Sequence, residues 1–493
     1  MSRILQIHPD DNVAVALEPL KAGDVVETSA GAVTLRQDIP QGHKLALMDI
    51  PSEAAVVKYG FPIGHATQAI HVGDWVHSHD LATSLDGEAV TSASIAVPTR
   101  SVVPASRTFQ GFRRKGGVGI RNEIWIIPTV GCVNSVAETL ARIVSHDIRG
   151  SVTGVYAWPH PYGCSQTGDD QEHTRRILCD LICHPNAGGV LVLGLGCENS
   201  NIGELKKLLG NWDPERIAFL ECQSVPDELE AGRALLRQLI DHASKDVRCS
   251  IPVSELVVGL KCGGSDGLSG ITANPAVGVF SDLLIAEGGT TILTEVPEMF
   301  GAETLLMNRC ENEEIFHQTI DLINDFKNYF TAHNQTIYEN PSPGNKKGGI
   351  STLEDKSLGC TQKSGSAPVR GVLSYGEPVR THGLNLLSAP GNDLVASTAL
   401  AASGAQIVLF TTGRGTPFAS PVPTVKISSN LALSEKKKNW IDFDCGRLVT
   451  GTSLSELGKM LFDYVIRVAN GEQVKSEAAG YHDMAIFKQG VTL

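Results

Sequence analysis

Four cysteines that each follow an apolar run and lie next to a glycine constrain the fold of this chain more than any other feature. Cys132, Cys164, Cys197 and Cys262 are 32, 33 and 65 residues apart, and about 30 residues is the length of one β-α-β unit. A further apolar run at residues 218–222 supplies the strand expected within the longest interval. The spacing therefore predicts an α/β fold with mainly parallel sheets.

The position of these cysteines also predicts a site. Ligands bind open parallel sheets beyond the carboxyl ends of the strands. Because each cysteine follows a strand-like run, we expect all four to converge on one sheet edge. The alternative is that glycine and cysteine are simply small residues that suit tight turns. For the four cysteines together, we favour a functional site.

The composition is that of a soluble, multidomain enzyme. The chain has 493 residues, of which 42 % are hydrophobic and 19 % charged, so it can bury a core and is not intrinsically disordered. Acidic residues outnumber basic ones by 54 to 41, giving a net charge of -13, which argues against a nucleic-acid or anionic-membrane surface. No apolar run approaches the ~18 residues of a membrane span, and no secretory signal is present. Eleven cysteines without an export signal indicate cytoplasmic thiols or metal ligands.

We expect three domains along the chain. Residues 1–88 contain short strand-like runs separated by glycine and proline turns, which predicts a small β-rich domain. Residues 89–108 are rich in Ala, Ser, Thr, Val and Pro and are expected to be a linker. Residues 109–250 and 251–493 are predicted to form two α/β domains. A polar break followed by a loose stretch indicates a sub-boundary near residues 340–368.

A long polar and glycine-rich segment follows the strand expected at residues 255–260. It runs from Lys261 to Pro275 and contains four glycines. Glycines let backbone N–H groups approach an anion, and a following helix N-terminus adds partial positive charge. Lys261 and Asp266 add groups that bind ligands or transfer protons. The segment matches neither a Walker A loop nor a dinucleotide fingerprint, and a purely structural turn is the alternative.

Two basic segments are candidate anion-binding sites. Lys346 and Lys347 are flanked by glycines, so they are suited to clamp a carboxylate, and a desolvated lysine can act as a base. A solvated surface loop is the competing explanation. Arg414 follows the buried strand expected at residues 406–410 and suits bidentate carboxylate binding, although a structural arginine fits the composition equally well.

Carboxylates and histidines provide further candidates. Glu295 and Glu298 follow a strand-like run at residues 290–293, where paired carboxylates bind a divalent cation or act in acid–base catalysis. Carboxylates at a helix start explain them equally well. His77 and His79 would share one face of a strand and suit a transition metal, with surface histidines as the alternative.

Six short motifs occur in order along the chain. They lie at residues 41–44, 162–164, 194–198, 262–266 with 272–278, 340–349 and 411–417. Together they resemble the altronate and galactarate dehydratase family of sugar-acid hydro-lyases, and the resemblance covers almost the whole chain. It implies that the N-terminal segment is an SAF-like domain of the β-clip type ahead of two α/β domains. Residues 11–17 and 77–80 are more similar to altronate than to galactarate dehydratases.

The resemblance implies a metal-dependent dehydration. The expected cofactor is Fe2+, with Mn2+ as a substitute, and the expected reaction converts D-altronate to 2-dehydro-3-deoxy-D-gluconate in hexuronate breakdown. A base removes the C2 proton while the C3 hydroxyl leaves, and the enol then tautomerises to the keto acid. A divalent metal that chelates the carboxylate and a hydroxyl stabilises the enolate-like charge. An iron–sulfur cluster ranks lower, because the chain has no Cys-x-x-Cys pair.

Residue roles follow as hypotheses. The catalytic candidates are Lys346 or Lys347 as base or carboxylate clamp and Asp266 and His43 as acid–base groups. The candidates for substrate binding are Lys44, Gly263, Gly264, Ser265, Asn274, Asn345 and Arg414. The candidate metal ligands are Cys164, Cys197 and Cys262, together with Glu295 as a harder ligand that manganese would favour.

Two other functions remain open at this stage. A lyase acting on galactarate or another hydroxy acid would keep the scaffold and change the substrate pocket. A non-catalytic sugar-acid-binding protein would bind its ligand without metal and without turnover. In each case the expected partner is a small sugar acid rather than a nucleic acid or a membrane, and homo-oligomer formation is left open.

Overall fold

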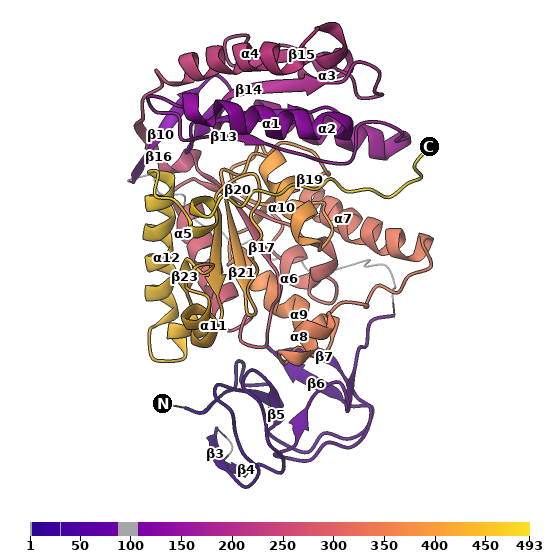
Figure 1. Cartoon of the computed structure of the whole chain (residues 1–493). Helices are drawn as coiled ribbons and strands as arrows, with labels where there is room; N and C mark the ends of the chain where they lie inside the picture. Colours follow the sequence, from indigo (N-terminus) through magenta and orange to yellow (C-terminus); the bar gives the residue numbers. More distant parts are fainter. Residues whose placement is uncertain (1, 30, 87–106) are drawn as a thin grey trace.

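The computed structural model describes residues 2–29, 31–86 and 107–493. The linker expected at residues 89–108 therefore lies almost entirely outside the described residues. A small β-rich region lies at one end of the molecule, a large sheet with its helices in the middle, and a second sheet with its helices at the opposite end (Figure 1). The predicted fold class, a β-rich N-terminal domain followed by α/β structure with parallel sheets, is confirmed.

The N-terminal region, residues 2–86, consists of short antiparallel strands joined by tight turns. Its sheets have the orders β1-β2-β5-β8, β3-β4 and β6-β7-β9. At Gly64 the paired strand comes so close that an added Cβ would lie 2.1 Å from the Ala82 carbonyl oxygen, so only glycine fits there. The strands are β1 (Ile4–Leu5), β2 (Val13–Ala16), β3 (Val25–Thr28), β4 (Gly31–Thr34), β5 (Lys44–Ala46), β6 (Ala55–Lys58), β7 (Phe61–Ala66), β8 (Trp75–Val76) and β9 (Leu81–Ala82).

A four-stranded parallel sheet follows, with the order β13-β12-β14-β15. Its central strand β14 is buried along its whole length, as expected when helices cover both faces of a parallel sheet. Helices α1 and α4 pack on one face and α2 and α3 on the other. The elements are β12 (Glu123–Pro128), α1 (Asn134–Val144), β13 (Gly154–Ala157), α2 (Gly168–Cys183), β14 (Ala187–Gly194), α3 (Ile202–Leu209), β15 (Ile217–Glu221) and α4 (Glu228–Ala243).

A seven-stranded parallel sheet forms the centre of the molecule, with the order β19-β20-β18-β17-β21-β22-β23. Helices α5 and α12 pack against each other in one hydrophobic cluster of this sheet. The strands are β17 (Val257–Cys262), β18 (Thr290–Leu293), β19 (Val369–Leu373), β20 (Gly383–Leu387), β21 (Ile407–Thr412), β22 (Thr424–Ser428) and β23 (Phe443–Asp444). The helices are α5 (Ala273–Ala286), α6 (Glu303–Met307), α7 (Glu313–Ala332), α8 (Pro343–Lys347), α9 (Leu353–Cys360), α10 (Asp393–Ala402), α11 (Leu431–Lys436), α12 (Leu454–Ala469) and α13 (Lys475–Ala478).

The two parallel sheets are held together by shared packing. One hydrophobic cluster contains side chains of α2 from the four-stranded unit and of α10 from the seven-stranded unit. A small antiparallel sheet of β11 (Gly117–Gly119), β10 (Thr108–Arg114) and β16 (Cys249–Pro252) lies where the chain passes between the units. The C-terminal tail also crosses the junction, because the backbone N–H groups of Gln489 and Gly490 donate to the Asp170 carboxylate. None of the helices in the described ranges has the length and apolar character of a membrane span.

The expectation that four cysteines share one sheet edge is wrong. Cys132, Cys164 and Cys197 follow strands of the four-stranded sheet, whereas Cys262 ends β17 of the seven-stranded sheet. The interval of 65 residues before Cys262 contains β15 and α4 of the first unit and then the passage to the second. The spacing of the cysteines therefore does not show that the strands before them belong to one sheet.

Candidate active site

Two thiols and one carboxylate meet at the carboxyl end of the seven-stranded sheet. The Sγ atoms of Cys262 and Cys360 lie 3.0 Å and 3.1 Å from Glu298 Oε2, and 3.4 Å from each other. All three side chains are buried, with exposed fractions of 1 %, 4 % and 5 % for Cys262, Cys360 and Glu298. Within the described ranges, this Cys262–Glu298–Cys360 cluster is the one group of three metal-binding side chains whose donor atoms all lie within 4.8 Å of one another.

Backbone geometry brings these side chains together. Glu295 has a left-handed φ of 69°, which turns the chain sharply after β18. Its carboxylate accepts a hydrogen bond of 2.8 Å from the Cys262 N–H and so ties this turn to the end of β17. Asn274, at the start of α5, donates to the Gly359 carbonyl at 3.0 Å and fixes the end of α9 next to Cys360. The cluster is thus assembled from three separate segments.

Buried lysines balance the charge of the cluster. Lys356 Nζ lies 2.8 Å from Glu298 Oε1, which leaves Oε2 facing the thiols. The hydrogen bond from Cys360 and the ammonium groups of Lys363 and Lys356 lower the pKa of Cys262 to about 6. Burial alone would raise the pKa of Glu298, but Lys356 and Lys363 lower it to about 2. The buried lysines therefore favour the charged forms of Cys262 and Glu298.

This donor set fits a divalent transition metal. Thiolate sulfur and carboxylate oxygen are both ligands of iron and zinc, and structural metal sites in proteins commonly use four donors. Three protein donors leave room for oxygen atoms of a substrate or water. Glu295 lies next to the cluster, and Lys261 Nζ is 2.8 Å from its Oε1, so this carboxylate is already paired with a buried ammonium group.

The N-terminal region closes over this sheet edge through a buried ion-pair network. Lys44 and Lys58 each place Nζ 2.8 Å from an oxygen of Asp355, the residue before Lys356. Lys44 Nζ also donates to the Gly349 carbonyl and to Ser351 Oγ, so its three N–H bonds are all used within the protein. Although burial alone would raise the pKa of Asp355, the two lysines hold it far below its ordinary value.

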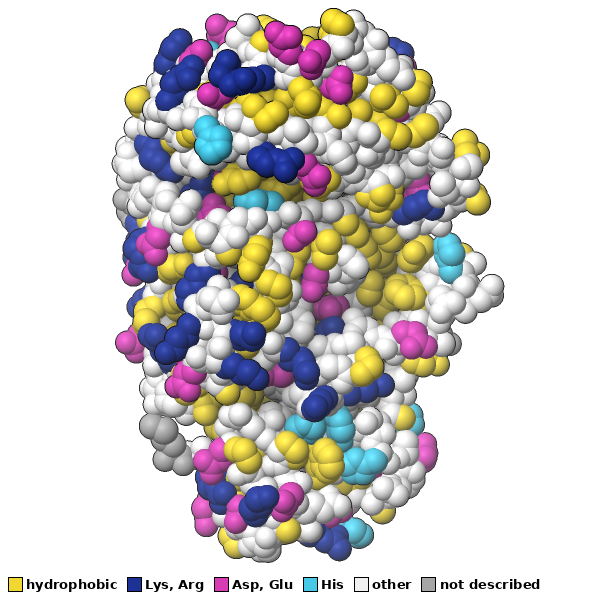
Figure 2. Space-filling view, in the orientation of Figure 1, with side chains coloured by type: hydrophobic (Ala, Val, Ile, Leu, Met, Phe, Trp, Pro, Cys, Tyr) yellow, Lys and Arg dark blue, Asp and Glu magenta, His cyan; other side chains and the backbone are white. Residues whose placement is uncertain are grey.

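Histidines of the N-terminal region face the same segment. His43 Nδ1 accepts a hydrogen bond of 3.1 Å from the Trp75 indole N–H, which places the proton on Nε2, 3.3 Å from the Lys347 carbonyl oxygen. His77 Nδ1 lies 2.9 Å from Ser351 Oγ. Burial lowers the pKa of both rings, that of His77 to about 3. Figure 2 shows histidine side chains gathered where the N-terminal region meets the rest of the molecule, with basic side chains directly above them.

Exposed cations surround the junction. Lys346 and Lys347 lie on the short helix α8, and no carboxylate within the described ranges pairs with either ammonium group. Arg414 is also exposed and donates to the Gly344 carbonyl at 3.2 Å. Asn345, between these cations, is buried and donates to the Ser265 carbonyl at 2.8 Å. The predicted basic groups therefore border the predicted glycine-rich segment.

That glycine-rich segment is held by Asp266. One oxygen of Asp266 accepts hydrogen bonds from the backbone and hydroxyl of Ser269 and from the Ser429 hydroxyl, and the other accepts from Asn430. Gly264 has a φ of +65°, and a Cβ on Gly263 would lie 2.5 Å from the Phe410 ring. The two glycines are thus required by a left-handed turn and by a close contact, respectively.

The remaining predicted ligands lie elsewhere. Cys132, Cys164 and Cys197 are exposed at the edge of the four-stranded sheet. The Cys164 thiol donates to Asn199 Oδ1 at 3.4 Å, and Gln223 Nε2 donates to the Cys197 sulfur at 3.8 Å. The structure brings Cys262 and Glu295 together and leaves Cys164 and Cys197 apart from them on a different sheet.

The sequence reasoning missed Cys360, Lys356, Lys363, Lys58 and Asp355. The stretch after residue 349 was expected to be loose, but it forms α9, in which every residue is buried. Cys360 ends a helix and does not directly follow a strand. The expectation that site residues follow strands therefore could not identify it. A usable indication was the spacing of Lys356 and Cys360, which are four residues apart and hence on one helix face.

Comparison with known protein families gives a match for each of three consecutive regions of the chain. The chain matches the altronate/galactarate dehydratase SAF domain at residues 2–84, the D-galactarate dehydratase/altronate hydrolase second domain at 111–244, and the D-galactarate/altronate dehydratase C-terminal domain at 253–492. It is 55 % identical to altronate dehydratase from Bacillus subtilis (strain 168), with 100 % of both chains covered. This chain belongs to the altronate/galactarate dehydratase family.

Two further relatives of this dehydratase come from Escherichia coli (strain K12). It is 52 % identical to altronate dehydratase, with 99 % of each chain covered. It is 34 % identical to galactarate dehydratase (L-threo-forming), with 98 % of this chain and 96 % of the relative covered. The family member is therefore an enzyme, a hydro-lyase that dehydrates a sugar acid.

Proposed function

We propose that this hydro-lyase converts D-altronate to 2-dehydro-3-deoxy-D-gluconate at the edge of the seven-stranded sheet that the N-terminal region covers. The observation that carries the proposal is the buried Cys262–Glu298–Cys360 cluster with its paired lysines. The choice of altronate is supported by the relatives of that name, which are more similar to this chain than the galactarate dehydratase is.

Cys262, Glu298 and Cys360 would hold Fe2+, with Mn2+ as a substitute. A bound divalent cation supplies Lewis acidity, which stabilises negative charge that develops on substrate oxygens. Glu295 lies beside these ligands through its bond to the Cys262 N–H, and we assign it to orienting them. A site that uses Cys164 and Cys197 is the rival position for the iron, and an iron–sulfur cluster is the lower-ranked alternative to a single ion.

Proton transfer is assigned to groups around the covered edge. One of Lys346 and Lys347 accepts the C2 proton, and the C3–O bond breaks as the hydroxyl takes a proton. His43, whose Nε2 carries a proton, is the proposed hydrogen-bond donor to that leaving hydroxyl. The lysine ammonium group passes the proton taken from C2 to the hydroxyl, which completes the water. The hydroxyl proton of the resulting enol is transferred to C3, which gives the 2-keto-3-deoxy acid. Water is the other product, so the atoms balance.

The substrate carboxylate would be bound by exposed cations and the glycine-rich segment. Arg414 offers a bidentate fork, and the lysine that does not act as base adds a second positive charge. The segment from Gly263 to Ser265 provides backbone groups beside them. Asp266, whose oxygens are fully used in holding this segment, is assigned a positioning role, as are Lys44, Asn274 and Asn345.

Substrate entry would require the N-terminal region to move. The cavity between Lys58, Asp266 and Cys360 has a volume of only about 10 Å³, which is the space of roughly one water molecule. A six-carbon acid needs far more room. The contacts of Lys44 and Lys58 with Asp355 would therefore break on opening and re-form on closure, which would exclude bulk water during the reaction.

Anaerobic turnover of a panel of aldonates and aldarates with added Fe2+ tests this proposal. The readout is the 2-keto-3-deoxy acid. We expect D-altronate to be dehydrated and galactarate to be inert. Turnover of galactarate instead would keep the reaction and replace the substrate. No keto acid from any substrate, with iron bound to the protein, would overturn the proposal in favour of ligand binding or another lyase reaction.

A further inference from the structure

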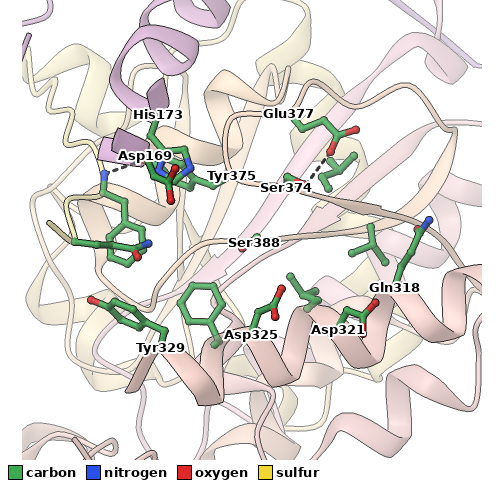
Figure 3. Close-up of a pocket in the computed structure, with 16 residues that line it drawn as sticks. Asp169, His173, Gln318, Asp321, Asp325, Tyr329, Ser374, Tyr375, Glu377 and Ser388 are labelled. Atoms are coloured by element: carbon green, nitrogen blue, oxygen red, sulfur yellow. Dashed lines mark hydrogen bonds between the residues drawn. The ribbon is translucent and has the colours of Figure 1, made fainter. Parts of the chain in front are cut away.

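A large cavity lies away from the covered sheet edge. It has a volume of about 780 Å³, within the range of small-molecule sites. Its walls come from α2 of the four-stranded unit, from α7 and the ends of β19 and β20 of the seven-stranded unit, and from the C-terminal tail (Figure 3). No member of the Cys262–Glu298–Cys360 cluster lines it.

The charge of this cavity has one sign. Four carboxylates line it, those of Asp169, Asp321, Asp325 and Glu377, and no lysine or arginine does. In Figure 3 the carboxylates of Asp321 and Asp325 point from α7 toward the side that carries Asp169 and Glu377. Asp321 and Asp325 are one helical turn apart, a spacing at which like charges destabilise a helix. Such a field repels the sugar-acid substrate and attracts a cation.

Four aromatic rings form part of the remaining wall. Phe487 of the C-terminal tail packs against Phe326 and Tyr329 of α7, with ring centroids 6.4 Å and 5.6 Å apart, and against Tyr375 at 5.9 Å. His173 lies edge-on to Tyr375, with the ring centroids 5.1 Å apart. Its Nδ1 is buried and has no hydrogen-bond partner within the described ranges, and burial lowers the pKa of the ring. A neutral imidazole offers an acceptor nitrogen to an N–H donor.

We propose that this cavity binds a small organic cation, an alkylammonium or guanidinium ion. Aromatic faces attract such cations, and carboxylates at the rim add charge complementarity. A bare metal ion fits less well, because within the described ranges no three of these carboxylates bring their oxygens within 4.8 Å of one another. Since α2 and α7 belong to different sheets, the bound cation links the two α/β units independently of the dehydration site.

Isothermal titration calorimetry of the full-length protein tests the proposal. The probes are putrescine, agmatine and choline, with KCl and MgCl2 at matched ionic strength. We expect saturable binding of one organic cation per chain, together with a rise in melting temperature that the salts do not reproduce. The double substitution Asp321→Asn with Asp325→Asn is expected to weaken binding by about tenfold or more, and both residues are exposed, so folding is retained.

Two controls keep the test decisive. Glu313→Gln removes an exposed carboxylate at the start of the same helix outside the cavity and should leave binding unchanged. Asp169→Asn removes a carboxylate from α2 and should weaken binding, although α7 with Asp321 and Asp325 is unchanged. The proposal is overturned by the absence of saturable binding with all three probes. It is also overturned if the double variant binds as well as the wild type, or if MgCl2 gives the same response.

Discussion

The two parallel sheets of this enzyme end in similar sequences but present different chemistry. Gly131 and Cys132 follow β12 at an edge whose thiols are exposed. Cys262 ends β17 at an edge that is buried under α9 and the N-terminal region. Only the second edge gathers a carboxylate, two thiols and buried lysines within bonding distance, among the residues that the structure describes.

The difference shows what a cysteine at a strand end does and does not determine. The parallel strand fixes the position of the residue on the sheet edge. The environment comes from segments that are distant in sequence, such as Glu298 and Cys360 around Cys262. Burial next to ammonium groups lowers the pKa of the Cys262 thiol, which favours the thiolate that binds metals. The predictions below test this contrast, from the largest expected effect to the smallest.

Replacing the thiols of the two edges separates them most sharply. Cys262→Ser and Cys360→Ser should each abolish tight iron binding and lower kcat by about a thousandfold, because the charge stabilisation supplied by a metal is lost. Cys164→Ser and Cys197→Ser should retain both iron and activity. Elemental analysis of purified protein and anaerobic turnover provide the two readouts. Iron loss confined to the Cys164 and Cys197 variants would reverse the assignment of the two edges.

The next test weakens the contact between the N-terminal region and the edge of the seven-stranded sheet. Asp355→Asn leaves the buried ammonium groups of Lys44 and Lys58 without their carboxylate, which should lower the free energy of unfolding by about 3 to 5 kcal/mol. Activity should fall as well, because the N-terminal region no longer closes. Urea denaturation and steady-state kinetics measure these effects. Asp38→Asn, in an exposed pair with Lys21, is the matched control and should change neither quantity. Wild-type activity in Asp355→Asn would show that closure through this network is dispensable.

Arg414, the exposed arginine at the edge of the seven-stranded sheet, should affect substrate binding more than the chemical step. Arg414→Lys keeps the charge but loses the bidentate fork, so KM for D-altronate should rise by about tenfold with a smaller change in kcat. Arg237→Lys on α4 is the control, since this exposed arginine pairs with the half-buried Asp147 within the four-stranded unit. An unchanged KM would remove Arg414 from the substrate site.

The other sheet provides a buried charge that should affect stability alone. Glu123 begins β12, and burial together with the nearby Glu477 charge raises its pKa from 4.5 to about 8. The folded state then binds more protons than the unfolded state between these pH values, so stability falls as pH rises from about 4.5 to about 8. Glu123→Gln should flatten this dependence and add about 2 kcal/mol at pH 8, with turnover unchanged. Equal slopes in denaturation at pH 5 and pH 8 for both proteins would contradict it.

The fold was predictable because strand periodicity is local. The apolar run at residues 290–293 became β18 with the expected bounds. The change of sheet before Cys262 was not predictable, because a parallel strand has the same pattern in either sheet. Which strands are neighbours depends on long-range packing, including the hydrophobic cluster shared by α2 and α10.

The candidate site was predictable in part for the same reason. Cys262, Glu295 and the glycine-rich segment follow strands, and strand ends can be recognised from sequence. Cys360 and Lys356 lie on a helix whose every residue is buried, so its polar residues do not mark a solvent-facing side and its sequence has no clear amphipathic period. Lys58 and Asp355 are paired across nearly 300 residues. A pattern search along the chain cannot detect such a contact, since burial of opposite charges becomes apparent only in three dimensions.

Anomalous diffraction at the iron edge, from crystals of the enzyme prepared with Fe2+, tests the central claim most directly. The account predicts one strong peak between Cys262, Glu298 and Cys360, beneath the N-terminal region. A peak among Cys132, Cys164 and Cys197 at the edge of the four-stranded sheet would contradict it, and would move the dehydration site to the other unit.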